Sequence, residues 1–520
     1  MTRGVGELAI HLKRLFLLAL LLASAGLLAS CSDSAREEPL VVLEVDRWYP
    51  YNVEFPDPQE DFILQTIRKR LNIDLRFNFS TGRSQDWRTK LASRVASGDL
   101  PDMIYFFNMM DYRTARTQGY LIPLNEALKS GDLPEHLDYI TSDMLRTISD
   151  DRGEYYGIPN RTGPAVEGLF IRRDWLNALS LDAPRTVQEF AEVAEAFAKE
   201  DPDGNGKDDT YGFTAGGCMS CQDFWELLSA FTGNTSPDEY LLDGQLKGGW
   251  TSSEYREYLL FMNGLMQSGA LDPDLATNDS NTKREKIVQG QVGIFHYTGY
   301  PSELIQEMKA YNPQADIAYL PPLVGPAGTG SHWPTIHVPT TVGITEKAGK
   351  SPEKVRKIIE LMNWYYSDEG RELILYGKKG VNHVRQEGRK RLLEGKQNEY
   401  LEVYSLIGER SLFLDDEEVM RAMFPDERQF EVVRSMIQNG GKRGSVYSMG
   451  YAMERAELID DLKLFREQMA ARFIYGNAPL DDKGWSDYAD KHDHAYNGYT
   501  VRKAMLSDLR KGGYLSTHKE

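Results

Sequence analysis

The stretch Leu40-Val41-Val42-Leu43-Glu44-Val45 (residues 40–45, LVVLEV) is a continuous apolar run of the kind that forms a buried parallel strand. Residues 62–71 (FILQTIRKRL) then repeat apolar side chains at helical spacing, and residues 73–79 (IDLRFNF) alternate as a strand does. Strand, helix and strand in this order predict a β-α-β unit at the start of the folded chain.

The same alternation continues directly after this unit. Residues 87–97 (WRTKLASRVAS) have helical spacing and stop before Gly98, and residues 100–107 (LPDMIYFF) favour another strand. Strands that alternate with helices predict a mainly parallel sheet covered by helices, with ligands held beyond the carboxyl ends of the strands. Because 520 residues exceed what one small core accommodates, we expect two lobes that share a hinge.

The N-terminus predicts export followed by lipid anchoring. The basic residues Arg3, Lys13 and Arg14 precede an apolar run at residues 15–28 (LFLLALLLASAGLL). The sequence Leu-Ala-Ser-Cys follows at residues 28–31 and ends in Cys31. The run is shorter than the ~18 to 20 residues of a membrane-spanning helix. We therefore expect a lipoprotein signal peptide cleaved before Cys31, which would carry diacylglycerol and an acyl chain such as palmitate. An ordinary secreted protein with an accidental cysteine is the alternative.

Composition narrows the range of partners. The formal net charge of −18 and the isoelectric point near 5.1 argue against nucleic acid and against an electrostatic hold on anionic lipid. Hydrophobic, aromatic and charged shares of 41%, 11% and 27% are typical of a globular protein. After Cys31 only Cys218 and Cys221 remain. Two cysteines cannot complete a four-ligand zinc site, so a local disulfide is the simplest interpretation of this pair.

Residues 201–209 (DPDGNGKDD) have the spacing of a calcium-binding loop. Oxygen ligands at the first, third and fifth positions, a glycine at the sixth and a backbone carbonyl at the seventh suit a hard cation of the size of Ca²⁺. The twelfth position is Gly212 and the tenth is Thr210, so Asp208, Asp209 or water would have to supply the remaining oxygen. A polar turn without metal is the alternative. The expected ligands of this structural calcium are Asp201, Asp203, Asn205, Lys207 through its carbonyl, and Asp209.

A series of segments in fixed order resembles one protein family. The first are residues 98–104 (GDLPDMI), 119–124 (GYLIPL), 153–159 (GEYYGIP), 168–176 (GLFIRRDWL) and 184–190 (PRTVQEF). Later ones are residues 288–294 (VQGQVGI), 342–344 (VGI), 361–364 (LMNW) and 367–370 (SDEG). Together they resemble the extracellular solute-binding proteins, family 1, of carbohydrate ABC transporters. Within that family, residues 476–482 (GNAPLDD) resemble the oligosaccharide-binding lipoproteins of Gram-positive bacteria.

The resemblance implies an α/β fold of the periplasmic-binding-protein-like type, with two α/β lobes joined by a hinge and a ligand cleft between them. It also implies a monomer that delivers carbohydrate to the permease subunits of an ABC transporter. We expect a signal peptide at residues 1–30 and a lipidated tether at 31–38. The N-terminal lobe would take residues 39–160 and about 317–365, and the C-terminal lobe residues 161–316 and about 366–520 with a helical C-terminal extension.

Candidate ligand contacts follow from the expected strand ends. Sugars present flat C–H faces that stack on aromatic rings, and hydroxyl pairs that bind carboxylates and amides. Similarity to maltose-binding proteins adds Glu167 near the first crossover and Trp333 before a later one. Core packing is the alternative explanation for any single aromatic residue. Position at a strand end gives the candidates Trp48, Tyr49, Phe107, Asn108, Asp111, His296, Tyr297 and Tyr300.

The sequence contains no HExxH, GxSxG or phosphate-cradling Gly-Lys-Ser/Thr motif, and His492-Asp493-His494 is interpreted as a solvated polar turn. We therefore expect a sugar-binding lipoprotein on the extracytoplasmic face of the cell membrane, and not an enzyme. Two alternatives stay open. A surface-anchored glycan-degrading enzyme would need two carboxylates about 5 to 10 Å apart across the bond it cleaves. A sensory or structural lipoprotein would bind its ligand without a permease.

Overall fold

The computed structural model describes most of the chain after residue 39. The predictions for the signal peptide, for the lipidated Cys31 and its tether, and for Asn108, Cys218 and Trp333 lie outside the described residues. The described residues are 40–49, 57–81, 84–107, 109–127, 135–141, 144–145, 148–150, 152–161, 163–164, 166–216, 219, 221–242, 245–331, 340–393, 414–439 and 456–511.

The first sheet begins with the predicted β-α-β unit. β1 (Val41–Tyr49) pairs in parallel with β2 (Ile73–Thr81), and α2 (Phe62–Leu71) connects them. β3 (Met103–Phe106) is the parallel neighbour on the other side of β1. The order of strand, helix and strand expected from the alternation of residues is therefore confirmed for the first three strands.

α2 begins and ends where its sequence dictates. The Asp61 carboxylate accepts hydrogen bonds from the backbone N–H groups of Ile63 at 2.7 Å and Leu64 at 3.1 Å, so it caps the N-terminus. The helix ends at Asn72, whose φ of 57° is left-handed. Its buried face, which includes Ile67, packs into the same core as the first sheet.

A late segment of the chain completes this sheet. β13 (Thr341–Ile344) runs antiparallel between β3 and β4 (Gly157–Pro159), which gives the order β2-β1-β3-β13-β4. All four residues of β13 are buried. Gly343 is needed there, because a Cβ at this position would lie 2.7 Å from the Phe106 ring and 2.9 Å from the Leu121 side chain.

The second sheet has four strands in the order β10-β5-β9-β6. β5 (Glu167–Arg172) is antiparallel to β10 (Ile317–Leu320) and to β9 (Val292–Thr298), and β6 (Tyr211–Phe213) is parallel to β9. This sheet departs from the mainly parallel arrangement that the alternation predicted. The reason is that the chain enters β5 from the first lobe, and both strands beside β5 run back toward that lobe.

The remaining elements cover the two sheets. Three short hairpins are β7/β8 (Tyr240–Leu242, Gln245–Lys247), β11/β12 (Val324–Gly325, Gly328–Thr329) and β14/β15 (His383–Gln386, Arg389–Leu392). The other α-helices are α3 (Ser84–Ala96), α4 (Met109–Thr117), α6 (Arg173–Leu179), α7 (Val187–Lys199), α8 (Trp225–Thr232), α9 (Ser253–Ser268), α10 (Ser280–Val288), α11 (Ser302–Tyr311), α12 (Glu346–Gly349), α13 (Pro352–Tyr366), α14 (Asp368–Tyr376), α15 (Glu417–Met423), α16 (Glu427–Asn439), α17 (Ala456–Ile474), α18 (Asp482–Asp490) and α19 (Gly498–Lys511).

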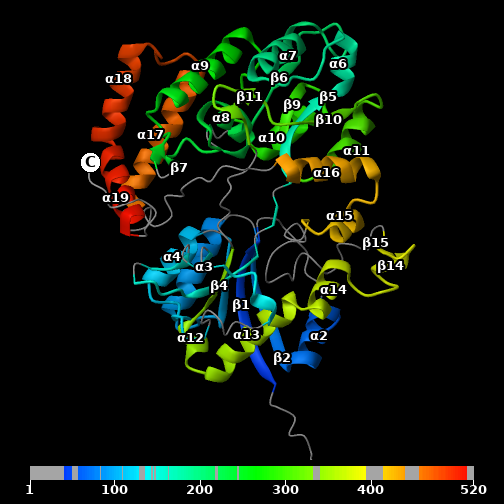
Figure 1. Cartoon of the computed structure of the whole chain (residues 1–520), viewed down its shortest axis with the longest axis vertical. Helices are drawn as coiled ribbons and strands as arrows, with labels where there is room; N and C mark the ends of the chain where they lie inside the picture. Colours follow the sequence, from blue (N-terminus) through cyan, green and yellow to red (C-terminus); the bar gives the residue numbers. More distant parts are fainter. Residues whose placement is uncertain are drawn as a thin grey trace, which may run out of the picture.

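Two large hydrophobic cores divide the molecule into two lobes (Figure 1). The first core joins the first sheet to α2, α13 and α14, and the second joins the second sheet to α7, α8, α9 and α17. Two segments differ from the expected bounds, since β10 pairs within the second sheet and α14 contributes Ile374 to the first core. The C-terminal helices pack on the second lobe, where Phe473 and Tyr488 enter its core. In the described part of the chain, no helix combines the length and the apolar character needed to span a membrane.

His492 contradicts its sequence interpretation. Its side chain is buried, Arg466 Nε donates to its Nε2 at 3.0 Å, and its Nδ1 lies 2.8 Å from Asp493 Oδ1. Burial, reinforced by the charge of Arg466, lowers the pKa of His492 to about 4. The prediction of a solvated turn is therefore wrong for His492, which is a neutral packed residue, whereas His494 is exposed.

Gly343→Ala tests the close packing of β13. We expect this substitution to lower the free energy of unfolding by about 1 to 3 kcal/mol, because the new methyl group must displace Phe106 and Leu121 in a filled core. Gly264→Ala on α9 is the control: nothing lies within 4 Å of its Cβ position, and alanine should raise stability by roughly 0.5 to 1 kcal/mol. Chemical denaturation measures both changes, and an unchanged midpoint for Gly343→Ala would contradict the packing.

Candidate functional site

The chain crosses between the lobes beside the ends of β4, β5 and β13. Residues 160–166 lead from β4 to β5, and the return path ends at Thr340, just before β13. The two crossings are joined, because Asn160 Nδ2 donates to Thr340 Oγ1 at 2.7 Å. At the second lobe, Ser331 N donates to Ser229 Oγ at 2.7 Å. The strand ends near these crossings therefore border the region between the lobes (Figure 1).

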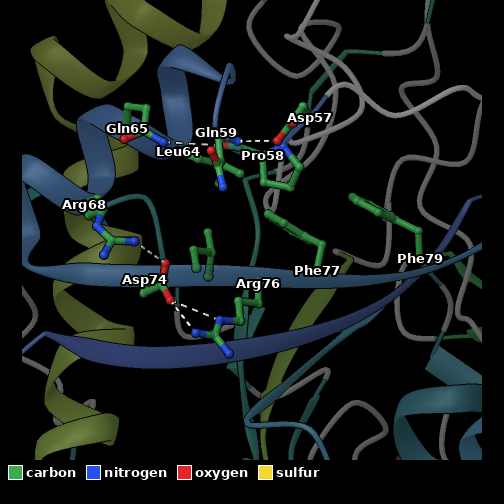
Figure 2. Close-up of a pocket in the computed structure, with 11 residues that line it drawn as sticks. Asp57, Pro58, Gln59, Leu64, Gln65, Arg68, Asp74, Arg76, Phe77 and Phe79 are labelled. Carbon is green, nitrogen blue, oxygen red and sulfur yellow. Dashed lines mark hydrogen bonds and ion pairs between the residues drawn. The ribbon is translucent and has the colours of Figure 1, made fainter.

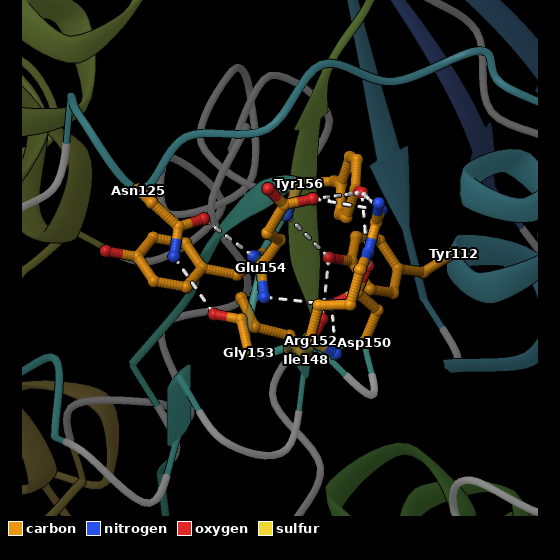
Figure 3. A network of polar contacts seen from close by, with 9 residues as sticks. Tyr112, Asn125, Ile148, Asp150, Arg152, Gly153, Glu154 and Tyr156 are labelled. Carbon is orange, nitrogen blue, oxygen red and sulfur yellow. Dashed lines mark hydrogen bonds and ion pairs between the residues drawn. The ribbon is translucent and has the colours of Figure 1, made fainter.

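A polar network holds the turn that leads into β4 (Figure 3). Tyr112 Oη donates to the Ile148 carbonyl at 2.9 Å and accepts from Tyr156 N at 3.0 Å. The Asp150 carboxylate accepts from Glu154 N at 2.9 Å and from Tyr156 Oη at 3.2 Å. These contacts fix where β4 begins, and so they also fix the start of the first crossing.

Four side chains at the ends of β1 and β3 form an aromatic surface on the first lobe. Phe107 packs edge-to-face against Trp48, with 5.4 Å between centroids, and against Tyr105, with 4.9 Å. The Arg47 guanidinium lies over the Tyr105 ring, 4.4 Å from its centroid, and Arg47 is 1% exposed. Trp48 and Phe107 are half-buried. We call this set the aromatic wall: Arg47, Trp48, Tyr105 and Phe107.

Five ionisable side chains meet on the second lobe, beside the first residue of β5. Lys283 Nζ lies 2.5 Å from Asp223 Oδ1, and the same oxygen lies 3.3 Å from His296 Nδ1. His296 Nε2 in turn lies 3.6 Å from Glu167 Oε2. Glu226 Oε2 accepts from the backbone of β5, at 3.3 Å from Leu169 N. We call this set the His296 cluster: Glu167, Asp223, Glu226, Lys283 and His296.

Burial controls the protonation of the His296 cluster. It raises the pKa of Glu167 well above the ordinary value, and the charges of Asp223 and Glu226 raise it further against a small opposing effect of the Thr298 hydroxyl. Burial likewise lowers the pKa of His296, although Asp223 opposes this. For Asp223 the effect of burial is outweighed by the hydrogen bond from His296 and the Lys283 ammonium, so its pKa falls to about 2. The arrangement favours a neutral Glu167 and a neutral His296 beside an ionised Asp223.

The structure brings four of the predicted ligand residues together in two pairs. Trp48 and Phe107 are in contact in the aromatic wall, and Glu167 and His296 are neighbours in the His296 cluster. Sequence reasoning missed the other members of both sets. An arginine inside an apolar strand, and two acidic residues three apart at the start of a helix, are the signals that could have found Arg47, Asp223 and Glu226.

The remaining candidates lie elsewhere. Asp111 pairs with Arg88 Nε at 2.6 Å between α3 and α4. Tyr297 packs beside the small core of α10, α11 and β9, on the opposite face of β9 from His296 because side chains alternate along a strand. The Tyr300 ring lies 6.4 Å from Phe424, beside the core that joins α15 to α16. Tyr49 ends β1, but its side chain lies outside the described part of the structure.

Residues 201–209 form a compact exposed loop between α7 and β6. The Asp201 carboxylate accepts from Asn205 N and Gly206 N, each at 3.0 Å. Asn205 Nδ2 donates to Asp203 Oδ2 at 2.8 Å and to Asp209 Oδ1 at 3.1 Å, and Lys207 N donates to Asn205 Oδ1 at 2.7 Å. Carboxylate and amide oxygens thus gather inside one turn, which is the donor type that Ca²⁺ prefers. Among the described residues, however, no group of three or more His, Cys, Asp or Glu is placed to hold a metal ion.

A hollow of about 950 Å³ lies on the first lobe between α2 and β2 (Figure 2). Within it, Asp74 pairs with Arg68 and Arg76, each at 2.8 Å, and the Phe77 and Phe79 rings stack with centroids 5.0 Å apart. β2 and β4 form opposite edges of the first sheet, so this hollow lies on the far side of the sheet from the first crossing. None of the residues that line it belongs to the aromatic wall or to the His296 cluster.

Comparison with curated proteins gives related sequences. Lipoprotein LipO of Bacillus subtilis is 28% identical over 354 residues, which cover 65% of this chain and 68% of LipO. The polygalacturonan/rhamnogalacturonan-binding protein YtcQ of the same organism is 24% identical over 379 residues, which cover 72% of this chain and 74% of YtcQ.

One similar solved structure is that of FusA, an ABC transporter substrate-binding protein of Streptococcus pneumoniae, in complex with kestose. Its TM-score is 0.65 at 19% identity, and the match covers 91% of this chain and 98% of FusA. A FusA EF-hand mutant in complex with fructo-nystose has a TM-score of 0.61, with the same identity and coverage. At this identity the likeness shows the fold alone, which is the expected two-lobed α/β arrangement. The sequence profile described as bacterial extracellular solute-binding protein matches residues 56–372, more than half of the 520 residues. The chain therefore belongs to the family of bacterial extracellular solute-binding proteins.

Proposed function

We propose that this protein captures a sugar or oligosaccharide between its lobes and delivers it to the permease subunits of an ABC transporter. The observation that carries the proposal is the aromatic wall on one lobe and the polar His296 cluster on the other, both beside the crossings. Two relatives support it: YtcQ is named for binding polygalacturonan and rhamnogalacturonan, and the FusA structure contains kestose.

Capture of this kind requires no bond to be made or broken. The C–H faces of a sugar would stack on Trp48 and Phe107, and its hydroxyl groups would bond to polar groups of the second lobe. A ligand that touches both lobes stabilises the closed arrangement through its higher affinity for that state, with movement at the segments that connect the lobes. For the division of the chain we propose the lobe bounds expected from the sequence, with β10 moved to the second lobe and α14 to the first.

Alanine substitutions in the aromatic wall test this function. Trp48→Ala and Phe107→Ala should each weaken binding by roughly 1 to 3 kcal/mol, the scale of one lost aromatic contact surface. Tyr311→Ala is the control, because Tyr311 is 63% exposed on α11 and belongs to neither set. Calorimetry with an oligosaccharide found by thermal-shift screening measures the affinity, and melting curves show that each variant is folded.

Two outcomes would contradict this proposal in different ways. Parent-like affinity of both wall variants would mean that the ligand binds elsewhere on the protein. Steady cleavage of the glycan during long incubation, followed by chromatography, would favour the glycan-degrading enzyme, for which a carboxylate with a raised pKa such as Glu167 would be the first candidate acid.

We also propose that residues 201–209 hold a structural Ca²⁺ ion through Asp201, Asp203, Asn205, the Lys207 carbonyl and Asp209. The hydrogen bonds of the loop support this, because they gather the carboxylates of Asp203 and Asp209 around the side-chain amide of Asn205. Burial raises the pKa of Asp203, and the neighbouring Asp201 and Asp209 raise it further. The contribution of these neighbours reflects repulsion between carboxylates, which a divalent cation would relieve. The relative FusA is described as having an EF-hand, since one of its structures is that of an EF-hand mutant.

Chelation tests the calcium proposal. Removal of Ca²⁺ from metal-loaded protein should lower the melting temperature, because a ligand of the native state stabilises it by mass action. Asp203→Ala should abolish this shift, whereas Glu200→Ala, which removes an exposed acidic residue just before the loop, should keep it. A melting curve that does not respond to chelator in parent protein of measured calcium content would identify the loop as a polar turn.

Lipid anchoring at Cys31 is the third part of the proposal, supported by the signal sequence and by the relative LipO, a lipoprotein. Cys31→Ala should release the protein from membranes with its melting temperature unchanged, because the anchor precedes the folded lobes. Cys221→Ala is the control and should remain membrane-bound. Fractionation and metabolic lipid labelling check both, and membrane retention of unlabelled Cys31→Ala protein would rule out this anchor.

A further inference from the structure

The His296 cluster contains two hydrogen-bond acceptors that face each other. His296 Nδ1 lies 3.3 Å from Asp223 Oδ1, and a neutral ring that donates its N–H to this carboxylate carries its lone pair on Nε2, which lies 3.6 Å from Glu167 Oε2. His296 and Glu167 are only 3% and 2% exposed, and neither His296 Nε2 nor the Glu167 oxygens make a hydrogen bond of ordinary geometry to a described residue. Two buried acceptors at this distance need a proton between them, or a donor from outside the protein.

The groups around this pair fix the orientation of the imidazole. Asp223 is fully engaged, because Oδ1 faces Lys283 Nζ and His296 Nδ1 while Oδ2 accepts from Gly216 N at 2.7 Å. Each neighbouring element contributes one group: Asp223 from residues 222–224, Glu226 from α8, Lys283 from α10 and Thr298 from β9. From β10, Tyr319 adds a phenol whose pKa is raised by burial and by the Glu226 charge, so it stays neutral.

We propose that Asp223 and Lys283 are positioning residues that hold His296 in its Nδ1–H form, so that His296 and Glu167 share one proton and present an uncharged pair to a neutral sugar ring. The inference rests on the proposed sugar capture and adds the chemical class of the sugar. Hydroxyl groups can satisfy both members of the pair, because each hydroxyl donates one hydrogen bond and accepts others.

The charges of the cluster exclude an acidic sugar at the same place. Lys283 balances Asp223 and the shared proton balances Glu167, so the cluster has no unbalanced cation to offer to an acidic sugar. A uronate carboxylate brought to this place would lose its hydration without gaining a cationic partner, which is unfavourable for a buried charge. Arg47 of the opposite lobe is a cation, but it is stacked on the Tyr105 ring and is 1% exposed.

The Asp223→Asn variant tests the positioning role in the absence of any ligand. In serine protease triads the same exchange behind a histidine keeps the geometry but gives the wrong tautomer. We expect the ¹⁵N chemical shifts of the His296 ring, assigned with His296→Gln, to report the Nδ1–H form in the parent and loss of that form in Asp223→Asn. A parent ring in the Nε2–H form, or a doubly protonated ring at neutral pH, would overturn the proposal.

Asp272→Asn is the matched control for this experiment. Asp272 is also buried and pairs with a lysine of α10, since Lys286 Nζ lies 2.8 Å from its Oδ1, but it stands outside the His296 cluster. Its substitution should disturb stability to a similar degree and leave the His296 tautomer as in the parent. A tautomer change of equal size in both variants would show a general loosening of the lobe, which also contradicts the specific role of Asp223.

Calorimetry with two panels of equal chain length tests the sugar class, one of neutral oligosaccharides that includes kestose and one of uronates that includes trigalacturonate. Neutral sugars should bind at least about tenfold tighter than uronates. Asp223→Asn should weaken the binding of the neutral sugars roughly tenfold to a hundredfold, whereas Asp272→Asn should leave their affinity near that of the parent.

The outcomes separate this inference from the function on which it rests. If a uronate binds more tightly than any neutral sugar, sugar capture stands and the charge argument fails. Arg47 would then be the first candidate for the group that binds the uronate carboxylate. If neither panel binds, the proposed capture fails together with the sugar class, and the ¹⁵N measurement still decides the role of Asp223. A neutral ligand whose affinity is the same in Asp223→Asn and the parent would overturn the positioning role alone.

Discussion

The return of β13 to the first sheet is the constraint on which the two-lobed arrangement depends. β13 lies between β3 and β4, and the residues that follow it are fastened to the same edge: Thr345 Oγ1 donates to the Pro101 carbonyl at 2.5 Å, and Lys354 Nζ pairs with Asp102 at 2.8 Å. These partners are 244 and 252 residues apart. The first sheet is therefore complete only after the chain has passed through the residues that form the second sheet, a long-range closure that favours slow folding.

This constraint also places the two halves of the candidate site. Since β4 leaves the first sheet beside β13, the outgoing and returning crossings lie together and are bonded through Asn160 and Thr340. β1 and β3 are parallel neighbours, so the residues at their ends, Trp48 and Phe107, meet on the first lobe. β5 and β9 are antiparallel, so the first residue of β5, Glu167, meets the end of β9 on the second. Both surfaces are consequences of strand direction.

The sequence could predict the parts of this arrangement that rest on local pattern. Periodicity gave the first β-α-β unit, and position at strand ends gave Trp48, Phe107 and His296. What it could not give is pairing across the chain, because Lys283 and Asp223 are 60 residues apart and nothing in either segment indicates the other. Position along the chain also does not reveal that a later element packs beside a strand end, as Phe424 does beside Tyr300. The prediction that His492 is solvated was wrong for a similar reason, since the elements around it bury a segment that is polar in composition.

Two acidic residues paired with lysines of α10 differ in how completely their surroundings are hydrogen-bonded. Asp272 is paired with Lys286 and accepts from Thr214, Asn278 and the Asp274 backbone, so its oxygens are satisfied. The His296 cluster, supported by Lys283 on the same helix, leaves the Glu167 oxygens and His296 Nε2 without such bonds to the described residues. Unsatisfied buried groups destabilise the native state by about 1 to 3 kcal/mol each, which an apolar side chain would avoid. Groups that are unsatisfied in the free protein can be satisfied when a ligand binds and supplies the missing hydrogen bonds. Hydroxyl groups of a sugar are donors of the required type.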